Sequence, residues 1–341
     1  MVVLFHVATR YPIAELDPVA RQFLRDGFPG VDIFYPLSGF LITRFLLTHA
    51  EKGAIGTFFL RRFFRIVPLD LVAVTLFYVA ARITGHDAAV IDRIWATYLF
   101  LTGWFAFFTG PDSVPYTITW SLSVEEFAYV ILGLSAWLMR RQFPLIVLAL
   151  AIAPIALRWH LYAAGYDNIY YFPLARLDSI ATGGLVALLI GRVRNLWIWL
   201  AAATALAGWA WSLKGPLGAT ALFTTVTLAT CTVICLCETA LRGLRSALID
   251  AAARVGLYSY FIYLFHFFIL YAAFKAVDLA GIAMPGFWVM SAICMAGTFA
   301  ASWLSFTFFE APVMQFGRRL ERSAPEAGEG AVTAAPARAR P

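Results

Sequence analysis

Long apolar runs separated by short polar segments fill most of the chain. A helix needs about 20 apolar residues to cross the hydrocarbon layer of a bilayer, and nine runs approach that length. These runs are approximately 28–48, 66–84, 119–139, 143–160, 172–191, 196–213, 217–237, 253–274 and 286–308. The pattern predicts an all-α, polytopic integral membrane protein built as a helical bundle.

The apolar segment Met1–Ala8 is too short to span a membrane. It has neither the basic start nor the cleavage site of a signal peptide. We interpret it as the end of a further helix whose beginning is missing. This truncated first helix brings the expected number of transmembrane helices to about ten.

Another apolar run, Trp95–Phe108, is ambiguous by length, and the charges of the loops decide its interpretation. Short cytoplasmic loops of membrane proteins collect lysine and arginine. If this run does not cross, thirteen basic residues share one side of the membrane; if it crosses, most of them fall outside. Those residues are Lys52, Arg61, Arg62, Arg65, Arg140, Arg141, Arg192, Arg194, Arg242, Arg245, Arg318, Arg319 and Arg322. We therefore interpret the run as a re-entrant or interfacial segment and expect both termini in the cytoplasm.

The composition agrees with this pattern and limits the classes of partner that we expect. Hydrophobic residues make up 61% of the chain, charged residues 13%, and the mean hydropathy is +0.77. The excess of 26 Lys and Arg over 20 Asp and Glu is typical of loops that face anionic lipids, and no base-reading or phosphate-cradling motif accompanies it. We expect membrane lipids and no nucleic acid among the partners. We also expect a transmembrane domain over residues 1–317 and a disordered cytoplasmic tail over residues 318–341.

Seven ionisable residues within the predicted spans fall at one depth, given a rise of about 1.5 Å per helical residue. They are His6, Asp32, Glu125, Glu126, Arg176, Asp178 and His266. Each is costly in lipid, so we expect them to face inward, to pair and to form a polar pocket open to the outside. The alternative is that they form local pairs, such as Arg176 with Asp178, that only tether helices.

A basic segment, Arg61–Pro68, leads into a predicted span from the cytoplasmic side. Arg62 and Arg65 lie three residues apart, so on a helix they project from one face. Their guanidinium groups suit phosphate oxygens. The alternative interpretation is a stop-transfer anchor or a lipid contact, which is common for basic clusters in this position.

Residues 30–42, GVDIFYPLSGFLI, closely resemble the GVDxFFxLSGFLI segment of the acyltransferase 3 family of membrane O-acyltransferases. Residues 61–68 resemble the family's RRxxRIxP element, which contains an R-x-x-R motif, and residues 119–127 resemble its WSLxVEExFY block. Further landmarks in the family's order are Phe5-His6, Phe172–Gly183, Tyr258–His266 and Phe309–Pro312.

This resemblance implies transfer of an acyl group, commonly acetyl, from cytoplasmic acyl-CoA to a hydroxyl of an extracytoplasmic or lipid-linked carbohydrate acceptor. Acyl-CoA (acetyl-CoA) is then a co-substrate, no tightly bound cofactor is expected, and the location is the cell inner (plasma) membrane. The resemblance also implies that the first-helix histidine, His6, is catalytic and that Arg62 and Arg65 bind acyl-CoA. The sequence does not select the acceptor, the acyl group or the oligomeric state.

The chain departs from the family pattern at two places. The family's basic residue eleven positions before the catalytic histidine would fall before Met1. Tyr35-Pro36 stands where the family tends to have Phe followed by a β-branched residue. We expect a local kink at this position.

The residue types fit the implied chemistry. A neutral imidazole can take the proton of an attacking hydroxyl near physiological pH, and His6 is the candidate for this base. A carboxylate can hold the tautomer of the imidazole, which gives Asp32 or Glu125 a supporting role. The remaining members of the predicted pocket are assigned to the substrate: Glu126, Arg176, Asp178 and His266.

We expect direct attack on the thioester rather than a covalent acyl-enzyme, because no Ser or Cys lies in a recognisable nucleophile motif. Ser38 and Ser123 are the alternatives, and helix packing is the other explanation for both. The four cysteines lie in apolar runs with no His or acidic residue at ligand spacing. We therefore expect neither a metal site nor a disulfide framework.

Two other classes of protein use similar features. A small-molecule transporter or flippase can use the same outer pocket, but no pair of Gly/Pro-broken helices in matching halves indicates an inverted repeat. A scaffold needs neither an outer polar layer nor arginines suited to phosphate. Consumption of acyl-CoA separates the enzyme from both.

Overall fold

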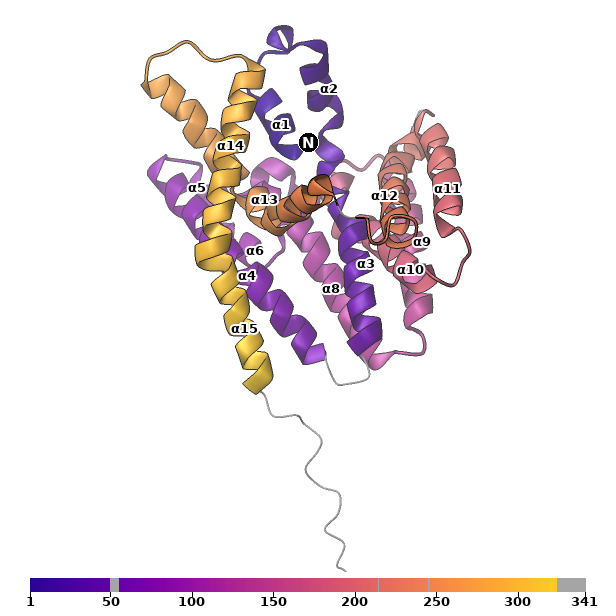
Figure 1. Cartoon of the computed structure of the whole chain (residues 1–341). Coiled ribbons are helices and arrows are strands. Elements are labelled where there is room, and N and C mark those ends of the chain that lie inside the picture. Colours follow the sequence, from indigo (N-terminus) through magenta and orange to yellow (C-terminus); the bar gives the residue numbers. More distant parts are fainter. Residues whose placement is uncertain (50–54, 214, 245, 324–341) are drawn as a thin grey trace, which may run out of the picture.

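The structure, a computed structural model, describes residues 1–49, 55–213, 215–244 and 246–323. Within these residues it is a bundle of helices without strands, so the all-α prediction is confirmed (Figure 1). From position 324 onward, the predicted disordered tail lies outside the described residues. The α-helices are α1 (Val2–Ala8), α2 (Pro18–Asp26), α3 (Phe34–His49), α4 (Ile55–Ile83), α5 (Ala88–Ile91), α6 (Ile94–Tyr98), α7 (Thr102–Thr109), α8 (Trp120–Leu138), α9 (Phe143–Ala163), α10 (Leu177–Leu189), α11 (Leu196–Trp211), α12 (Pro216–Thr239), α13 (Ala247–Leu279), α14 (Phe287–Ser305) and α15 (Ala311–Ser323).

Every one of the nine predicted runs contains a helix, and the protein is a multi-pass membrane protein. Six segments of the described chain are long and apolar enough to cross a membrane: Ile55–Ile83, Thr117–Leu138, Phe143–Ala163, Pro216–Thr239, Ile249–Leu279 and Phe287–Glu321. The apolar helices Phe34–Thr48 and Leu196–Trp211 are shorter, and α10 has only 13 residues. Helix length therefore supports six spans and does not establish the predicted number of about ten.

The ambiguous run Trp95–Phe108 does not form one helix. The α6 helix ends at Tyr98 and α7 begins at Thr102. Between them, Phe100 has a φ of 56°, a left-handed conformation that a continuing helix does not allow. The run is therefore divided into helices too short to span, which agrees with its interpretation as a re-entrant or interfacial segment.

The sequence predicts one span over residues 28–48, but the structure divides this stretch. A 3₁₀ turn occupies Phe28–Val31, and α3 begins only at Phe34. Pro36 therefore lies in the first turn of α3, where its missing N–H removes no hydrogen bond from the helix. The predicted kink inside a helix at Tyr35-Pro36 is thus wrong, because the helix starts there instead.

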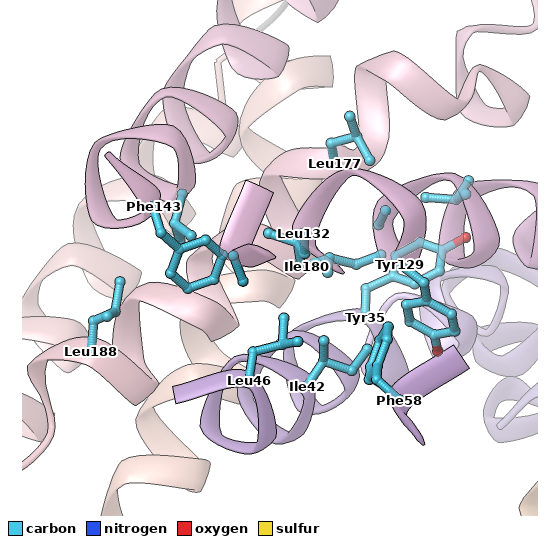
Figure 2. Close-up of a cluster of buried hydrophobic side chains, with 14 of the residues drawn as sticks. Tyr35, Ile42, Leu46, Phe58, Tyr129, Leu132, Phe143, Leu177, Ile180 and Leu188 are labelled. Carbon is cyan, nitrogen blue, oxygen red and sulfur yellow. The ribbon is translucent and has the colours of Figure 1, made fainter. Parts of the chain in front are cut away.

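The α3 and α10 helices pack closely because a glycine of each faces the other at their crossing. A Cβ atom added at Gly39 would overlap the backbone of Ile180, and one added at Gly183 would overlap the backbone of Pro36. Small residues at such a crossing let two helix backbones approach each other in a membrane. Buried apolar side chains of α3, α4, α8, α9 and α10 surround this crossing in one cluster (Figure 2).

The first and last helices of the described chain, α1 and α15, lie toward opposite ends of the bundle. Figure 1 shows α14 continuing into α15 along one side, and α9 to α12 gathered on the other. The α1 helix packs beside α14 at one end, and α15 packs against α4 toward the other end. The α1 helix, which carries His6, therefore lies away from the start of α4, which carries Arg62.

Candidate functional site

His6 on α1 and His266 on α13 lie side by side, with ring centroids 5.2 Å apart. The ring of Phe267 packs against both, at centroid distances of 4.4 Å and 4.8 Å. The Nδ1 atom of His266 lies 2.7 Å from the carbonyl oxygen of Tyr263 and 3.0 Å from that of Ile262. The structure thus brings together two histidines that the sequence places in one layer, from helices at opposite ends of the chain.

Both histidines line a cavity of about 460 Å³ whose walls are largely aromatic. The aromatic wall residues are Phe5, Trp120, Tyr170, Tyr171, Tyr263 and Phe267. Tyr170 and Tyr171 come from the 3₁₀ turn Ile169–Tyr171, and burial raises the pKa of both hydroxyls. These phenols therefore stay protonated and can donate hydrogen bonds, so the cavity combines apolar faces with polar donors.

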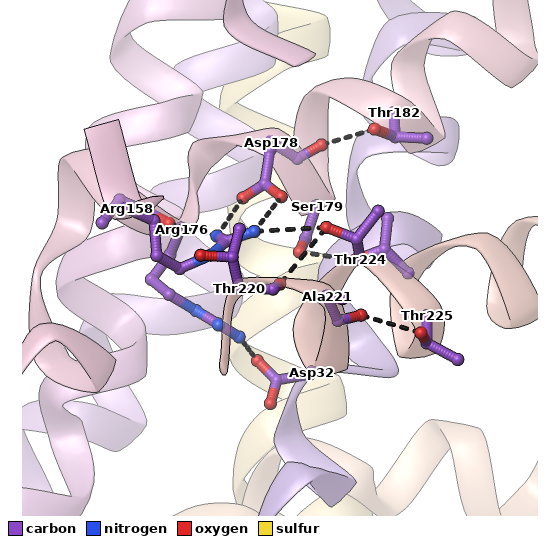
Figure 3. Close-up of polar contacts among 12 residues, drawn as sticks. Asp32, Arg158, Arg176, Asp178, Ser179, Thr182, Thr220, Ala221, Thr224 and Thr225 are labelled. Atoms are coloured by element: carbon purple, nitrogen blue, oxygen red, sulfur yellow. Dashed lines mark hydrogen bonds and ion pairs between the residues drawn. The ribbon is translucent and has the colours of Figure 1, made fainter. Parts of the chain in front are cut away.

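Two buried ion pairs join α10 and the turn before it to neighbouring segments (Figure 3). Arg176 pairs with Asp32, which lies just before α3. Asp178 accepts two hydrogen bonds from Arg158 of α9, with lengths of 3.0 Å and 2.9 Å. The local pair of Arg176 with Asp178 is not formed, because side chains two residues apart on a helix point in different directions. Each buried charge instead has a partner from another segment.

Arg158 is a buried charge that the sequence reasoning missed. Its Nη1 atom also donates to the carbonyl oxygen of Ala175 at 2.5 Å, and its Nη2 atom lies 3.4 Å from Oγ1 of Thr224. The side chain is fully buried. An arginine inside the apolar run 143–160 is the signal that could have found it, since ionisable residues in spans are rare and usually paired.

Tyr129, near the middle of α8, connects three helices. Its hydroxyl donates to Oε2 of Glu125 at 2.5 Å. Because that hydrogen is used, the Ser38 hydroxyl of α3, 2.8 Å away, donates to the oxygen of Tyr129. The guanidinium carbon of Arg62 lies 4.6 Å from the centroid of the Tyr129 ring, and its Nη1 atom lies 3.5 Å from the hydroxyl. Arg62 therefore turns into the bundle and shares a site with Glu125.

The seven ionisable residues consequently do not form one pocket. They divide into the histidine pair, the two ion pairs and the acidic side chains beside α4. In the described chain, no hydrogen bond or ion pair joins His6 to Asp32 or Glu125. Asp32 pairs with Arg176, and Glu125 accepts a hydrogen bond from Tyr129. Depth along a helix gives no information about the side of the helix on which a residue lies, so a shared depth does not make a shared site.

Asp70 and Glu126 have carboxyl oxygens without hydrogen-bond partners among the described residues. Asp70 is 1% exposed and lies on α4, eight residues after Arg62 and on the same face. The sequence reasoning included Glu126 and overlooked Asp70, although an acid within the run 66–84 is a clear signal. In the described part of the chain, no group of three or more His, Cys, Asp or Glu side chains is placed to hold a metal ion.

The two arginines of the R-x-x-R motif act on the same carboxyl group. The charges of Arg62 and Arg65 both act on Glu125 of α8. Arg65 is exposed, and its charge also acts on Glu310. Glu310 is buried at the end of the π-helical turn Phe306–Glu310 and accepts a hydrogen bond of 2.9 Å from Ser305.

The α15 helix supports the segment that carries these arginines. Arg61 donates two hydrogen bonds to Glu321, with lengths of 2.8 Å and 2.7 Å. The rings of Phe64 and Phe316 pack edge to face at a centroid distance of 5.7 Å. Gly317 lies so close to Phe64 that a side chain there would overlap its ring. The last helix thus fixes the position of the first turns of α4.

Comparison with known proteins places the chain among membrane acyltransferases. A sequence profile described as an acyltransferase domain matches residues 1–307. The chain therefore belongs to the acyltransferase 3 family. Its curated relatives include proteins named as O-acetyltransferases.

The similar curated proteins match this chain over about half of its length. Peptidoglycan O-acetyltransferase OatA of Listeria monocytogenes is 30% identical over 188 residues, which cover 49% of this chain and 30% of OatA. A Staphylococcus aureus (strain COL) protein named as an O-acetyltransferase is 26% identical over 188 residues, 50% of this chain and 31% of that protein. A Komagataeibacter xylinus protein named as a membrane-bound transacylase, BcsY, is 29% identical over 208 residues, 55% of this chain and 48% of BcsY. The chain thus spans a third to a half of these relatives, and no solved structure matches it.

Proposed function

We propose that the protein transfers an acyl group, commonly acetyl, from cytoplasmic acyl-CoA to a hydroxyl of an extracytoplasmic or lipid-linked glycan. The observation that supports this most strongly is the inward position of Arg62, which reaches from α4 to Tyr129 in the interior of the bundle. The α1 helix, whose His6 lines the cavity, lies toward the other end of the same bundle. A donor held by its phosphates and an acceptor bound in the cavity can therefore meet inside the protein.

Arg62 and Arg65 are the proposed binding residues for acyl-CoA, which serves as a co-substrate. Guanidinium groups match phosphate oxygens in geometry and charge. In the described structure, Arg62 stacks on Tyr129 and has one long hydrogen bond, so most of its N–H donors remain available to a phosphate. Its partly buried position also makes that interaction stronger than one in open water.

The transfer itself needs a base beside the acceptor hydroxyl, and His6 is the proposed base. The hydroxyl oxygen attacks the thioester carbonyl carbon while the imidazole takes the hydroxyl proton. A C–O bond forms, the C–S bond breaks, and the imidazolium returns the proton to the CoA thiolate. The products are an O-acyl ester and free CoA.

The aromatic cavity supports a carbohydrate acceptor. Flat aromatic faces pack against the apolar face of a sugar ring, and the hydroxyls of Tyr170 and Tyr171 can donate to sugar oxygens. The name of the Listeria relative specifies peptidoglycan, which is itself a glycan. The basic loops support a location in the inner (plasma) membrane with about ten spans and both termini in the cytoplasm.

The test uses membranes that contain the full chain, incubated with acetyl-labelled acetyl-CoA. We expect base-labile label in the glycan fraction, its loss in His6→Ala and in Arg62→Ala/Arg65→Ala, and its retention in Arg44→Ala. Arg44 is the matched control, since its side chain is 51% exposed and pairs with Glu238 on the surface. Wild-type labelling by a folded His6→Ala variant contradicts the proposal. Solute movement without consumption of acyl-CoA supports a transporter instead.

A further inference from the structure

The hydrogen on the ring of His266 has a fixed position. The Nδ1 atom lies within hydrogen-bond distance of two carbonyl oxygens, at 2.7 Å from Tyr263 and 3.0 Å from Ile262. Carbonyl oxygens only accept hydrogen bonds, so Nδ1 carries the hydrogen. In the neutral ring, Nε2 is then a bare acceptor.

The Nε2 atom of His266 lacks a hydrogen-bond donor in the described structure. It is buried and has no partner among the described residues, and His266 is only 1% exposed. The neighbouring hydroxyl of Tyr263 already donates to the carbonyl oxygen of Ile118. The ring of His6, 5.2 Å away between centroids, can supply an N–H group. A buried acceptor left without a donor is costly, so this pairing is favourable.

His6 has the complementary need. In the described chain, its ring nitrogens make no hydrogen bond, although both Asp32 and Glu125 lie in the same predicted layer. Those carboxylates are held by Arg176 and Tyr129. A histidine that acts as a base works best when its second nitrogen is held by an acceptor, because this fixes the tautomer and stabilises the cation.

We propose that His266 is the positioning residue for His6, an inference that rests on the proposed role of His6 as the base. A rotation of the His6 ring brings one of its nitrogens to Nε2 of His266, which then accepts a hydrogen bond and leaves the other His6 nitrogen bare toward the acceptor hydroxyl. When His6 takes the hydroxyl proton, this hydrogen bond stabilises its cation. His266 itself gains no proton, so the proton balance of the transfer is unchanged. A neutral partner also avoids a second buried charge beside the cavity.

In the described part of the chain, few other titratable or charged groups lie around the two rings. They are Arg10, Asp112, Tyr170, Tyr171 and Tyr263. A substitution at position 266 leaves all of them in place. A shift in the pH dependence of such a variant therefore reports on the contact between His6 and His266.

The kinetic test measures acetyl-CoA turnover by the purified full chain, supplied with a glycan acceptor, as a function of pH. His266→Phe removes the acceptor, so we expect kcat to fall by about 10- to 100-fold with little change in the KM for acetyl-CoA. The acidic limb of its pH profile should move to lower pH, because a less stabilised His6 cation deprotonates more easily. His266→Gln keeps an acceptor oxygen and should retain most of the activity. His86→Phe, the same change at an exposed histidine, is the matched control.

A second measurement does not depend on turnover. In protein labelled with ¹⁵N at its five histidines, we expect one tautomer for His6 in the wild type and a mixture of tautomers in His266→Phe. An unchanged tautomer, together with unchanged kcat and pH profile in His266→Phe, overturns the inference. Equal losses in folded His266→Gln and His266→Phe also overturn it, because an accepted hydrogen bond is then not what matters. Absence of turnover in the wild type argues against the proposed function, whereas the tautomers still decide the contact.

Discussion

Replacing Gly183 by alanine should force α10 away from α3. The added Cβ would lie 2.7 Å from the carbonyl carbon of Pro36 and 2.8 Å from its Cα, and nearer still to its carbonyl oxygen. Real Cβ contacts essentially never fall below 3.0 Å. The obstacle is backbone, so it cannot rotate aside as a side chain does. The two helices must therefore separate by on the order of 1 Å in a closely packed interior.

The expected cost follows from that geometry. Overpacking typically lowers the free energy of unfolding by about 1–3 kcal/mol. Because the obstacle here is backbone, we expect a loss of about 3 kcal/mol for Gly183→Ala. That loss lowers the folding equilibrium constant by about a hundredfold. At about 2 °C per kcal/mol for a chain of this size, the melting temperature should fall by about 6 °C.

The assay is thermal unfolding of the purified protein in detergent, followed by circular dichroism. Gly208→Ala in α11 is the matched control, because its Cβ would meet only the Thr225 Cγ2 atom at an ordinary 3.8 Å. Both variants gain the same helix propensity, about 1 kcal/mol. The difference between their melting temperatures therefore reports only the overlap at the crossing of α3 and α10. If Gly183→Ala melts at the same temperature as Gly208→Ala, the close contact of α3 and α10 is not what we describe.

Four further variants test the buried polar groups in the same assay. Arg158→Met leaves Asp178 unpaired and should lower the unfolding free energy by about 3–5 kcal/mol. Arg158→Met/Asp178→Leu removes both charges and should recover most of that stability. Equal losses of stability in the single and the double variant argue against the ion pair. Asp70→Leu removes a buried acid without a partner and should raise the unfolding free energy by about 1–3 kcal/mol, so a lower melting temperature counts against that view. Tyr129→Phe removes the donor of Glu125 and should cost about 1–3 kcal/mol, and no change would show that this hydrogen bond is not stabilising.

Features that depend on local hydrophobicity could be predicted from the sequence. The apolar runs identify the helices, because burial of about 20 apolar residues in lipid is a property of one segment alone. Loop charge indicates that Trp95–Phe108 does not cross the membrane. In the structure, the left-handed conformation of Phe100 divides this run into short helices. The closeness of His6 and His266 agrees with their predicted common depth.

Features that depend on how helices face one another could not be predicted. Arg176 and Asp178 are near in sequence, but each pairs with a residue of another segment, and no rule of spacing identifies those partners. Tyr129 was overlooked because it carries no charge, although it joins Glu125 to Arg62. The start of α3 at Phe34 is set by the preceding 3₁₀ turn rather than by hydrophobicity.

The most direct test of the central claim is the release of free CoA thiol from acetyl-CoA by the purified protein in liposomes supplied with a glycan acceptor, measured with a thiol reagent. The account predicts release by the wild type and by Arg44→Ala. It predicts loss of release in Arg62→Ala/Arg65→Ala, which lacks the phosphate-binding groups, and in His6→Ala, which lacks the base. Release at the wild-type rate by both of these variants, correctly folded, would contradict the account.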